Sequence, residues 1–206
     1  MEALSVPAQT QQWRFGPVDV IALPHEPGLR GEPQVRDRLA HWLGDPQAPP
    51  PLARDEWGRP RLLAPYQDRD AGWSHSGEQL LLALGRDVVL GVDLERWRPR
   101  PRALELAARY FAPGETRRLR ALPADAREAA FLRLWCAKEA LLKAHGRGLA
   151  FGLHRLEFSG MDDAADAPLR LVACDPALGE PGRWQLHEWE PQPGYRAALA
   201  WRPRSL

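Results

Sequence analysis

Hydrophobic and polar residues alternate, or apolar residues run together, in short stretches that predict β-strands. The first stretch covers residues 13–23 and is expected to form one strand. Two apolar stretches at residues 80–84 and 88–95 flank the turn-forming sequence Gly-Arg-Asp, which predicts a hairpin. Further strands are expected toward the carboxyl terminus, at residues 153–158, 168–174, 183–190 and 195–201.

Apolar residues at helical spacing predict helices in four other parts of the chain. They cover residues 33–44, 103–111, a short segment from residue 113, and 125–145. Asp125 and Glu128 resemble a capping box at the start of the longest helix, and Gly146 is a typical stop. The proline-rich residues 45–60 are expected to form a loop, and the basic residues 96–102 a linker.

The order of these elements predicts an α+β protein. A strand, a helix and more strands come first, and helices followed by strands come second. We therefore expect two similar α/β-type halves in one chain. Their boundary is predicted near residue 92, which gives halves of residues 1–91 and 92–206.

The charge balance argues against nucleic acid or an anionic membrane as a partner. The 206 residues include 28 Lys and Arg against 27 Asp and Glu, so any bound anion would need a local basic cluster. The apolar run at residues 80–84 is too short to span a bilayer, and no secretory leader is recognised. Two cysteines without CxxC spacing favour a soluble cytoplasmic protein that has no disulfide framework or structural zinc.

Two carboxylates in the sequence GVDLE are candidates for binding a divalent cation. Side chains alternate along a strand, so Asp93 and Glu95 share one face with Gly91. Like charges at this spacing repel unless a cation lies between them, and Mg²⁺ prefers oxygen ligands. A strand edge with two solvated acids is the alternative. The opposite face should point into a core and consists of Val88, Leu90, Val92 and Leu94.

Both lysines of the chain lie in the predicted long helix, in the sequence WCAKEALLK. Glu139 and Lys143 are four residues apart and share a helical face, one turn after Trp135. An ordinary surface ion pair would explain them, but arginine would serve such a pair equally well. The other 26 basic residues are all Arg. The retention of Lys138 and Lys143 therefore favours contact with phosphate through a compact, flexible cation.

Two weaker elements precede these motifs. Residues 74–77, SHSG, offer hydroxyls, an imidazole and backbone N–H groups that can cradle a phosphate, although a polar turn is the simpler explanation. Residues 57–60, WGRP, predict a tight turn that carries a basic side chain.

In order and spacing, these elements resemble the 4′-phosphopantetheinyl transferase superfamily. GVDLE and WCAKEALLK are similar to the family pattern G-[IV]-D-x-E followed by W-x-x-K-E-[AS]-x-x-K. The WGRP turn, the SHS element and FAPGE at residues 111–115 match the surfactin-type (Sfp-type) branch, whose members are one chain of two similar halves. The resemblance covers residues 57 to about 150. It implies a pseudo-dimeric fold with the active site between the halves.

The resemblance also implies an activity. Such enzymes transfer the phosphopantetheine arm of coenzyme A to a serine of an apo acyl, peptidyl or polyketide carrier protein, and they release adenosine 3′,5′-bisphosphate. This chain is expected to act in the same way as a monomer, with Mg²⁺ or Mn²⁺ as its metal.

The same resemblance implies roles for individual residues. The metal ligands are expected to be Asp93, Glu95 and Glu139. Glu139 would also accept the serine proton, and Lys143 would hold the reacting phosphate. Contacts with coenzyme A are expected from Gly58, Arg59, Pro60, Ser74, His75, Ser76, Lys138 and Lys143, with support of the site as the alternative for Lys138. Glu115 and Trp135 are expected to support the site from behind.

The chain departs from the family pattern near SHS. Members often have F-N-x-S-H-S, whereas Gly72 stands here in place of the asparagine and Trp73 follows it. Arg30, Arg36 and Arg38 are the candidates for binding the 3′-phosphate of coenzyme A.

Two other functions remain open. One is a Mg²⁺-dependent hydrolase of nucleotide diphosphates such as coenzyme A, in which water replaces the serine. The other is a non-catalytic module that binds carrier proteins. The intact set of Asp93, Glu95, Glu139 and Lys143 argues against the second.

Overall fold

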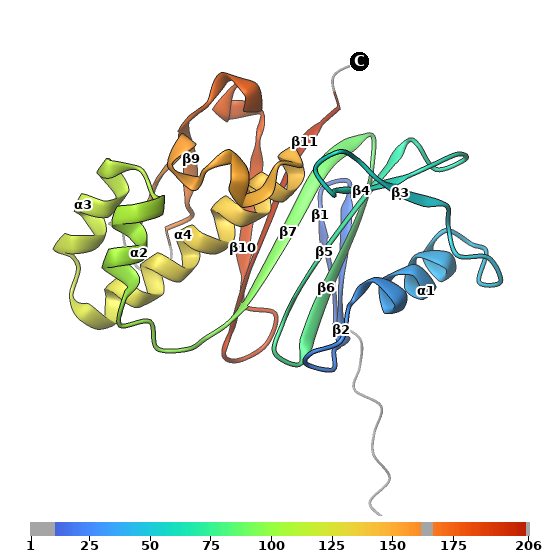
Figure 1. Ribbon diagram of the computed structural model, residues 1–206, viewed down its shortest axis with the longest axis horizontal. Coiled ribbons are helices and arrows are strands. Elements are labelled where there is room, and N and C mark those ends of the chain that lie inside the picture. Colours follow the sequence, from blue (N-terminus) through green and yellow to red (C-terminus); the bar gives the residue numbers. More distant parts are fainter. Residues whose placement is uncertain (1–10, 162–166, 205–206) are drawn as a thin grey trace, which may run out of the picture.

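The computed structural model describes residues 11–161 and 167–204. Two antiparallel sheets pack face to face in the centre, and helices cover their outer faces (Figure 1). The mixture of helices and sheets predicted from the sequence is confirmed. No helix within the described ranges is both long and apolar enough to cross a membrane.

The elements have the following bounds. The first sheet, in the order β1-β2-β6-β5, contains β1 (Gln12–Phe15), β2 (Val18–Pro24), β5 (Arg69–Ser76) and β6 (Gln79–Arg86). The second, in the order β10-β11-β7, contains β7 (Val88–Arg96), β10 (Gln185–Trp189) and β11 (Tyr195–Pro203). Two small sheets pair β3 (Leu52–Arg54) with β4 (Pro60–Leu62) and β8 (Leu156–Ser159) with β9 (Arg170–Cys174). The helices are α1 (Glu32–Trp42), α2 (Ala103–Tyr110), α3 (Pro113–Ala121) and α4 (Ala124–His145). Short 3-10 turns lie at Gly148–Phe151, Leu153–Arg155, Pro176–Leu178 and Pro181–Arg183.

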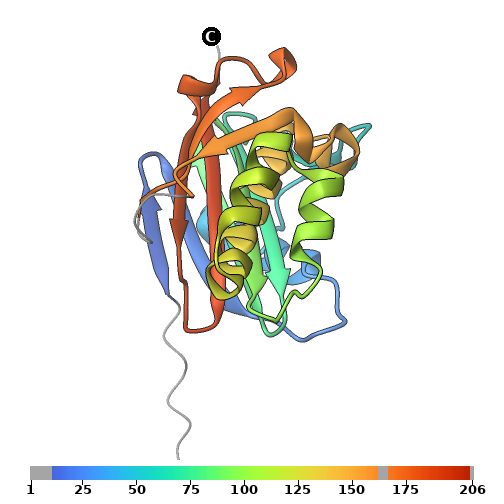
Figure 2. The same ribbon diagram turned by 90° about the vertical axis from the view of Figure 1, so that its left-hand side faces the viewer.

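A two-residue alternation along β6 explains the layers. Leu80 and Leu82 pack in the core that also contains Val35 of α1, whereas Leu81 and Ala83 pack between the two sheets. Both faces of this strand are therefore buried, which is why residues 80–84 are continuously apolar. On the far side, α4 covers the outer face of the second sheet, with α2 and α3 beside it (Figure 2).

Strand β7 has one apolar and one polar face, as predicted. Val88, Leu90, Val92 and Leu94 lie in the core between the sheets. The other face lies against α4, which passes directly over Gly91. A Cβ atom on this glycine would lie 2.2 Å from the carbonyl oxygen of Ala140 and 2.4 Å from the nitrogen of Ala144. Because both atoms belong to the helix backbone, only glycine permits this approach.

The predicted hairpin at residues 80–95 is wrong. Only Asp87, with φ of 54°, separates β6 from β7, yet the two strands belong to different sheets. Both edges of β6 are already paired, one with β2 and one with β5. Strand β7 pairs with β11 instead, and its polar face is covered by α4.

Other differences from the prediction are local. Residues 13–23 form two strands because Gly16, with φ of 60°, and Pro17 make a turn. The expected loop at residues 45–60 contains β3 and the start of β4, and residues 153–155 form a 3-10 turn before β8. Helix α4 begins at Ala124, one residue before the predicted Asp125, and its N-cap residue Pro123 makes no side-chain hydrogen bond. Glu128 accepts a hydrogen bond from the backbone N–H of Arg100 at 2.7 Å and tethers the linker instead.

The contact at Gly91 predicts a stability effect. Replacement of Gly91 by Ala should lower the free energy of unfolding by about 3 kcal/mol or more, because the methyl group would overlap backbone that cannot turn aside. Urea unfolding measures this change. Gly182→Ala is the matched control, since its added methyl would meet nothing within 4 Å. Similar unfolding midpoints for both variants would contradict the prediction.

Candidate active site

Lys143, Asp93 and Ser74 meet where α4 crosses β7 next to β5. The Nζ atom of Lys143 lies 2.6 Å from Oδ1 of Asp93 and donates a hydrogen bond to Oγ of Ser74 at 2.9 Å. The hydroxyl of Ser74 donates to the same Asp93 oxygen at 3.0 Å. Asp93 is only 4% exposed, whereas the side chain of Lys143 is 35% exposed. The alternative of a solvated acid is therefore excluded for Asp93.

Two further carboxylates surround this contact. Glu139 is 8% exposed, and burial raises its pKa to about 7, with the charges of Asp93 and Glu95 adding to the effect. Burial and the charge of Asp93 also raise the pKa of Glu95, which pairs with Nη2 of Arg100 at 3.0 Å. Burial alone would lower the pKa of Lys143, but the carboxylate of Asp93 raises it above its usual value. A single ammonium group thus faces several negative charges.

These carboxylates have the chemistry of a divalent-cation site without forming a preassembled one. The Oδ2 atom of Asp93 is buried and makes no hydrogen bond. Such an orphaned oxygen, together with the raised pKa of Glu139, indicates that Lys143 and Arg100 do not fully balance the negative charge of these carboxylates. However, no three His, Cys, Asp or Glu side chains in residues 11–161 and 167–204 are grouped so that they could hold a metal. Shared metal binding by Asp93, Glu95 and Glu139 stays a prediction, and it requires side chains to move.

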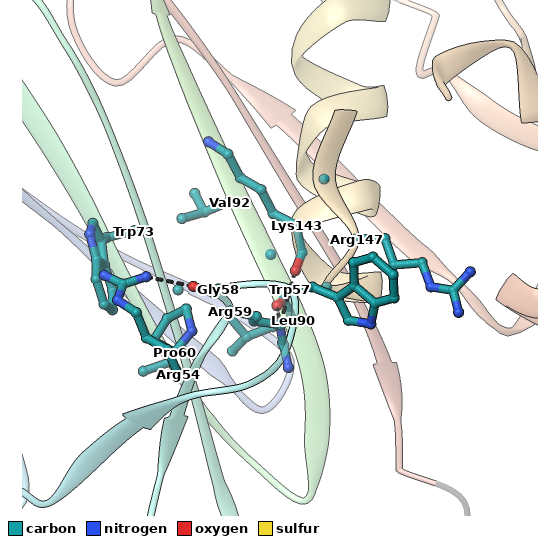
Figure 3. Close-up of a pocket in the computed structure, with 15 residues that line it drawn as sticks. Arg54, Trp57, Gly58, Arg59, Pro60, Trp73, Leu90, Val92, Lys143 and Arg147 are labelled. Atoms are coloured by element: carbon teal, nitrogen blue, oxygen red, sulfur yellow. Dashed lines mark hydrogen bonds between the residues drawn. The ribbon is translucent and has the colours of Figure 1, made fainter. Parts of the chain in front are cut away.

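A pocket of about 260 Å³ opens beside Lys143, between the β3–β4 turn and the end of α4. Figure 3 shows Lys143 extending from α4 across β7, with Trp57 and Arg147 side by side at one end of the pocket. The guanidinium carbon of Arg147 lies 4.8 Å from the centre of the Trp57 ring. Trp73 and Leu90 form other parts of the wall. Aromatic surface next to cations suits a planar ring that carries phosphate groups.

Comparison with known sequences assigns the family. The profile of the 4′-phosphopantetheinyl transferase superfamily matches residues 89–200, which is more than half of the chain. The chain belongs to this superfamily. The match begins in β7 and ends in β11, so it includes Asp93, Glu139 and Lys143.

Individual members of the superfamily are similar to the chain over a wider range. The 4′-phosphopantetheinyl transferase HetI of Nostoc is 35% identical over 137 residues, which are 64% of this chain and 53% of HetI. The transferase AcpT of Escherichia coli K12 is 33% identical over 132 residues, 61% of this chain and 67% of AcpT. The Synechocystis protein slr0495, whose name assigns it provisionally to the same activity, is 32% identical over 70% of this chain and 58% of its own length. The chain thus spans a little over half the length of slr0495 and HetI.

The superfamily motif residue Lys138 lies outside the site. Its side chain is 0% exposed, and its Nζ atom lies 2.7 Å from Oε2 of Glu115. It also donates to the carbonyl oxygens of Leu153 at 2.9 Å and Leu156 at 2.5 Å. Lys143 lies five positions after Lys138, so the two lysines leave α4 in nearly opposite directions. The structure encloses Lys138 in the carboxyl-terminal core and does not bring it to the pocket, which leaves support of the site as its expected role.

Glu115 and Trp135 support that core. The carboxylate of Glu115 accepts hydrogen bonds from the backbone N–H groups of Ala112 at 3.0 Å and Phe158 at 2.8 Å. Burial raises the pKa of Glu115 and lowers that of its partner Lys138 to about 8. The hydrogen-bond partners of Glu115 thus lie in the core and not at the pocket. Trp135 is half-buried and packs its ring against two phenylalanines.

The SHS element lies on strand β5, which separates its side chains. Ser74 joins Asp93 and Lys143, but His75 projects from the other face of the strand and packs against His25, with ring centres 4.3 Å apart. Ser76 accepts a hydrogen bond from the backbone N–H of the last residue of β7 at 3.0 Å. The three side chains therefore do not form one phosphate cradle.

Gly58, Arg59 and Pro60 all line the pocket. The turn before them is shaped by Asp55, whose Oδ1 accepts hydrogen bonds from the backbone N–H groups of Trp57 at 3.0 Å and Arg59 at 2.9 Å. Gly58 has φ of 82°, which favours glycine at this point of the turn. The side chain of Arg59 is only 4% exposed, so most of it is unavailable to a ligand.

The sequence did not indicate two residues that lie next to the site, Asp70 and Arg100. Asp70 is buried beside the pocket and pairs with Arg59 at 2.5 Å. A signal existed, since Asp70 shares the even positions of β5 with Ser74 and therefore the same face. Arg100 was assigned only to a basic linker, yet it turns back to pair with Glu95. Nothing in the spacing of RWRPRPR indicates which arginine does so.

The raised pKa of Glu139 predicts a pH-dependent stability. The pKa of Glu139 in the folded protein is about 7, so the carboxyl holds its proton up to that pH, whereas the usual pKa of an exposed Glu is 4.5. Ionisation of Glu139 therefore makes stability fall as the pH rises between these values. Glu139→Gln should remove this loss and exceed the wild type by about 2 to 3 kcal/mol at pH 8 but not at pH 4.5.

Urea unfolding at both pH values checks this expectation. Glu105→Gln is the control, because Glu105 lies exposed on α2 and its side chain pairs with nearby Arg102. If Glu139→Gln keeps the pH dependence of the wild type, the carboxyl of Glu139 is not the group that titrates.

The two lysines of α4 should differ in their effect on folding. Lys138→Met leaves the buried carboxylate of Glu115 without its cation and should lower the free energy of unfolding by about 3 to 5 kcal/mol. Lys143→Arg keeps a cation at a partly exposed position and should change it by less than about 1 kcal/mol. Thermal or urea unfolding measures both, and equal losses would contradict the assignment.

Proposed function

We propose that this chain transfers the 4′-phosphopantetheine arm of coenzyme A to a serine hydroxyl of an apo acyl, peptidyl or polyketide carrier protein. Adenosine 3′,5′-bisphosphate is the other product. The observation that carries the proposal is the contact of Lys143 with Asp93 beside Glu139, at a pocket of a chain that belongs to this superfamily. The relatives HetI and AcpT are named as transferases of this kind.

The transfer exchanges one phosphorus–oxygen bond for another. The serine oxygen attacks the phosphorus that carries the pantetheine arm, and the bond from that phosphorus to the bridging pyrophosphate oxygen breaks. The serine proton goes to Glu139, the buried carboxylate next to Lys143 and Asp93. The adenosine bisphosphate leaves with the electron pair of the broken bond. Lys143 places positive charge next to the phosphate oxygens throughout.

Asp93, Glu95 and Glu139 are the residues that would hold Mg²⁺ or Mn²⁺. A bound divalent ion would supply charge that offsets the negative charge of the pyrophosphate and of the leaving group. Two observations support this set. Lys143 contacts only Oδ1 of Asp93, and the other oxygen, Oδ2, makes no hydrogen bond. The charges of Asp93 and Glu95 also help to raise the pKa of Glu139, which a cation between them would reverse.

The adenine nucleotide of coenzyme A would occupy the pocket beside Lys143. Trp57 offers an aromatic face there, and Gly58 and Pro60 form the neighbouring turn. Ser74 lies within hydrogen-bond distance of the Lys143 ammonium, so it would share the same phosphate.

The 3′-phosphate would lie near His75, on the other face of β5. His25 packs against His75, and its buried Nε2 atom makes no hydrogen bond. His25 and Arg30 line a second pocket at this place. Of the three arginine candidates, Arg30 lines this pocket, whereas Arg36 and Arg38 do not, and Arg36 is already paired with Glu32 at 3.2 Å.

We further infer that the two sheets are the predicted halves of a pseudo-dimeric fold. The first sheet ends at Arg86 and the second starts at Val88, so Asp87 marks the division better than residue 92, which lies within β7. Ser74 then belongs to the first half and Lys143 to the second. The site would lie between halves of one chain, which is consistent with action as a cytoplasmic monomer.

The decisive experiment incubates the protein with coenzyme A, Mg²⁺ and a panel of apo carrier proteins. Mass spectrometry should show one or more carriers gaining the phosphopantetheine arm, together with release of adenosine bisphosphate. Cleavage of coenzyme A without any modified carrier would support the hydrolase instead. Carrier binding with neither reaction would support the non-catalytic module.

Lys143→Arg tests the role of the lysine in the same assay. The planar guanidinium is bulkier than an ammonium and cannot occupy the same point between Asp93 and Ser74. Turnover should fall by at least about tenfold, while stability is little changed. A variant that transfers the arm at the wild-type rate would remove Lys143 from the mechanism.

A further inference from the structure

Arg59 joins several separate parts of the protein behind the pocket. Its Nε atom donates to the backbone carbonyl oxygen of Lys143 at 2.9 Å. Its Nη2 atom donates to Oδ2 of Asp70 at 2.5 Å and to the carbonyl oxygen of Leu90 at 2.9 Å. These acceptors belong to α4, β5 and β7, respectively.

Asp70 completes the connection. The same Oδ2 atom that accepts from Arg59 also accepts the backbone N–H of Leu90 at 2.8 Å. Both side chains are almost fully buried, with 4% of Arg59 and 2% of Asp70 exposed. The ion pair therefore connects β5 to β7 at the position just before Gly91, where α4 touches the strand.

The hydrogen bond from Arg59 to the backbone of Lys143 is the contact that affects the proposed reaction. Lys143 lies in the last turn of α4, where backbone carbonyl oxygens have no partner within the helix. A buried cation at this end is favourable, because the negative end of the helix dipole lies there. Arg59 thus holds the backbone of the residue whose ammonium meets Asp93.

We propose that Arg59 and Asp70 are positioning residues that fix the backbone of Lys143 against β7, so that its ammonium group is aligned with Asp93. This role rests on the proposed transfer reaction, and it differs from the direct nucleotide contact that the family resemblance implies for Arg59. Only an arginine can fill it, because its planar fork reaches acceptors in three elements at once. A lysine offers a single nitrogen at the end of its stem.

Direct contact with the nucleotide is the competing role. Arg59 lines the pocket, and its buried Nη1 atom makes no hydrogen bond. The two roles predict different kinetics. A residue that only binds coenzyme A should raise KM without changing kcat, whereas misalignment of Lys143 lowers kcat.

The test compares Arg59→Lys, Asp70→Asn and the double variant with the wild type, using coenzyme A and a carrier that the wild type modifies. We expect each single variant to lower kcat by at least about tenfold and to change KM for coenzyme A by less than about threefold. The kcat of the double variant should be no lower than that of the more impaired single variant, because both residues act as one unit. Urea unfolding confirms that each variant is folded.

Arg61→Lys is the matched control. Arg61 lies in β4, two residues after Arg59, is partly exposed, and pairs with Asp55 at 3.0 Å. Its replacement should leave kcat and KM unchanged.

Each other outcome overturns the proposal. A raised KM with unchanged kcat assigns Arg59 to nucleotide binding. Additive losses of kcat in the double variant show that Arg59 and Asp70 act independently. Variants that are all unfolded at 25 °C make the pair a folding element only. An inactive wild type contradicts the proposed function itself, and an active wild type with unaffected variants contradicts only the positioning role.

Discussion

The direct contact between the backbones of α4 and β7 is the constraint on which the rest of the structure depends. At Gly91 the helix lies so close to the strand that no side chain fits between them. This contact sets the height of α4 above the sheet, and thereby the reach of Glu139 and Lys143 toward Asp93. A larger residue would raise the helix and part these groups, even if the core repacked elsewhere.

Helix α4 serves two environments with the same residue type. One lysine is enclosed with three oxygen acceptors, from Glu115, Leu153 and Leu156, and an ammonium group has three N–H donors. The other lysine, Lys143, is partly exposed to solvent and faces the carboxylate of Asp93. The number of acceptors thus explains why Lys138 is not one of the many arginines of this chain, without any contact to a substrate.

Periodicity predicted the parts of the fold that depend on local sequence. Helix α4, its stop at Gly146, and the apolar face of β7 follow from spacing alone, and the structure confirms them. Partner choice between strands does not follow from spacing, which is why β6 and β7 were wrongly joined as a hairpin. The candidate residues Asp93, Glu139 and Lys143 were found because motif spacing places them. The burial of Lys138 and the pairing of Arg59 with Asp70 depend on how separate elements pack together, so spacing does not indicate them, although the alternation of β5 places Asp70 on the same face as Ser74.

The division of β6 and β7 between two sheets also determines whether the molecule has a cleft at all. Strands β5 and β7 approach each other at the seam, but side chains such as Asp70, Ser74 and Ser76 make the connections. If β5 and β7 had been paired by regular backbone hydrogen bonds, the two sheets would have formed one continuous sheet, and no pocket would lie between these strands. The lack of backbone pairing between β5 and β7 is therefore what leaves room for a ligand beside Lys143.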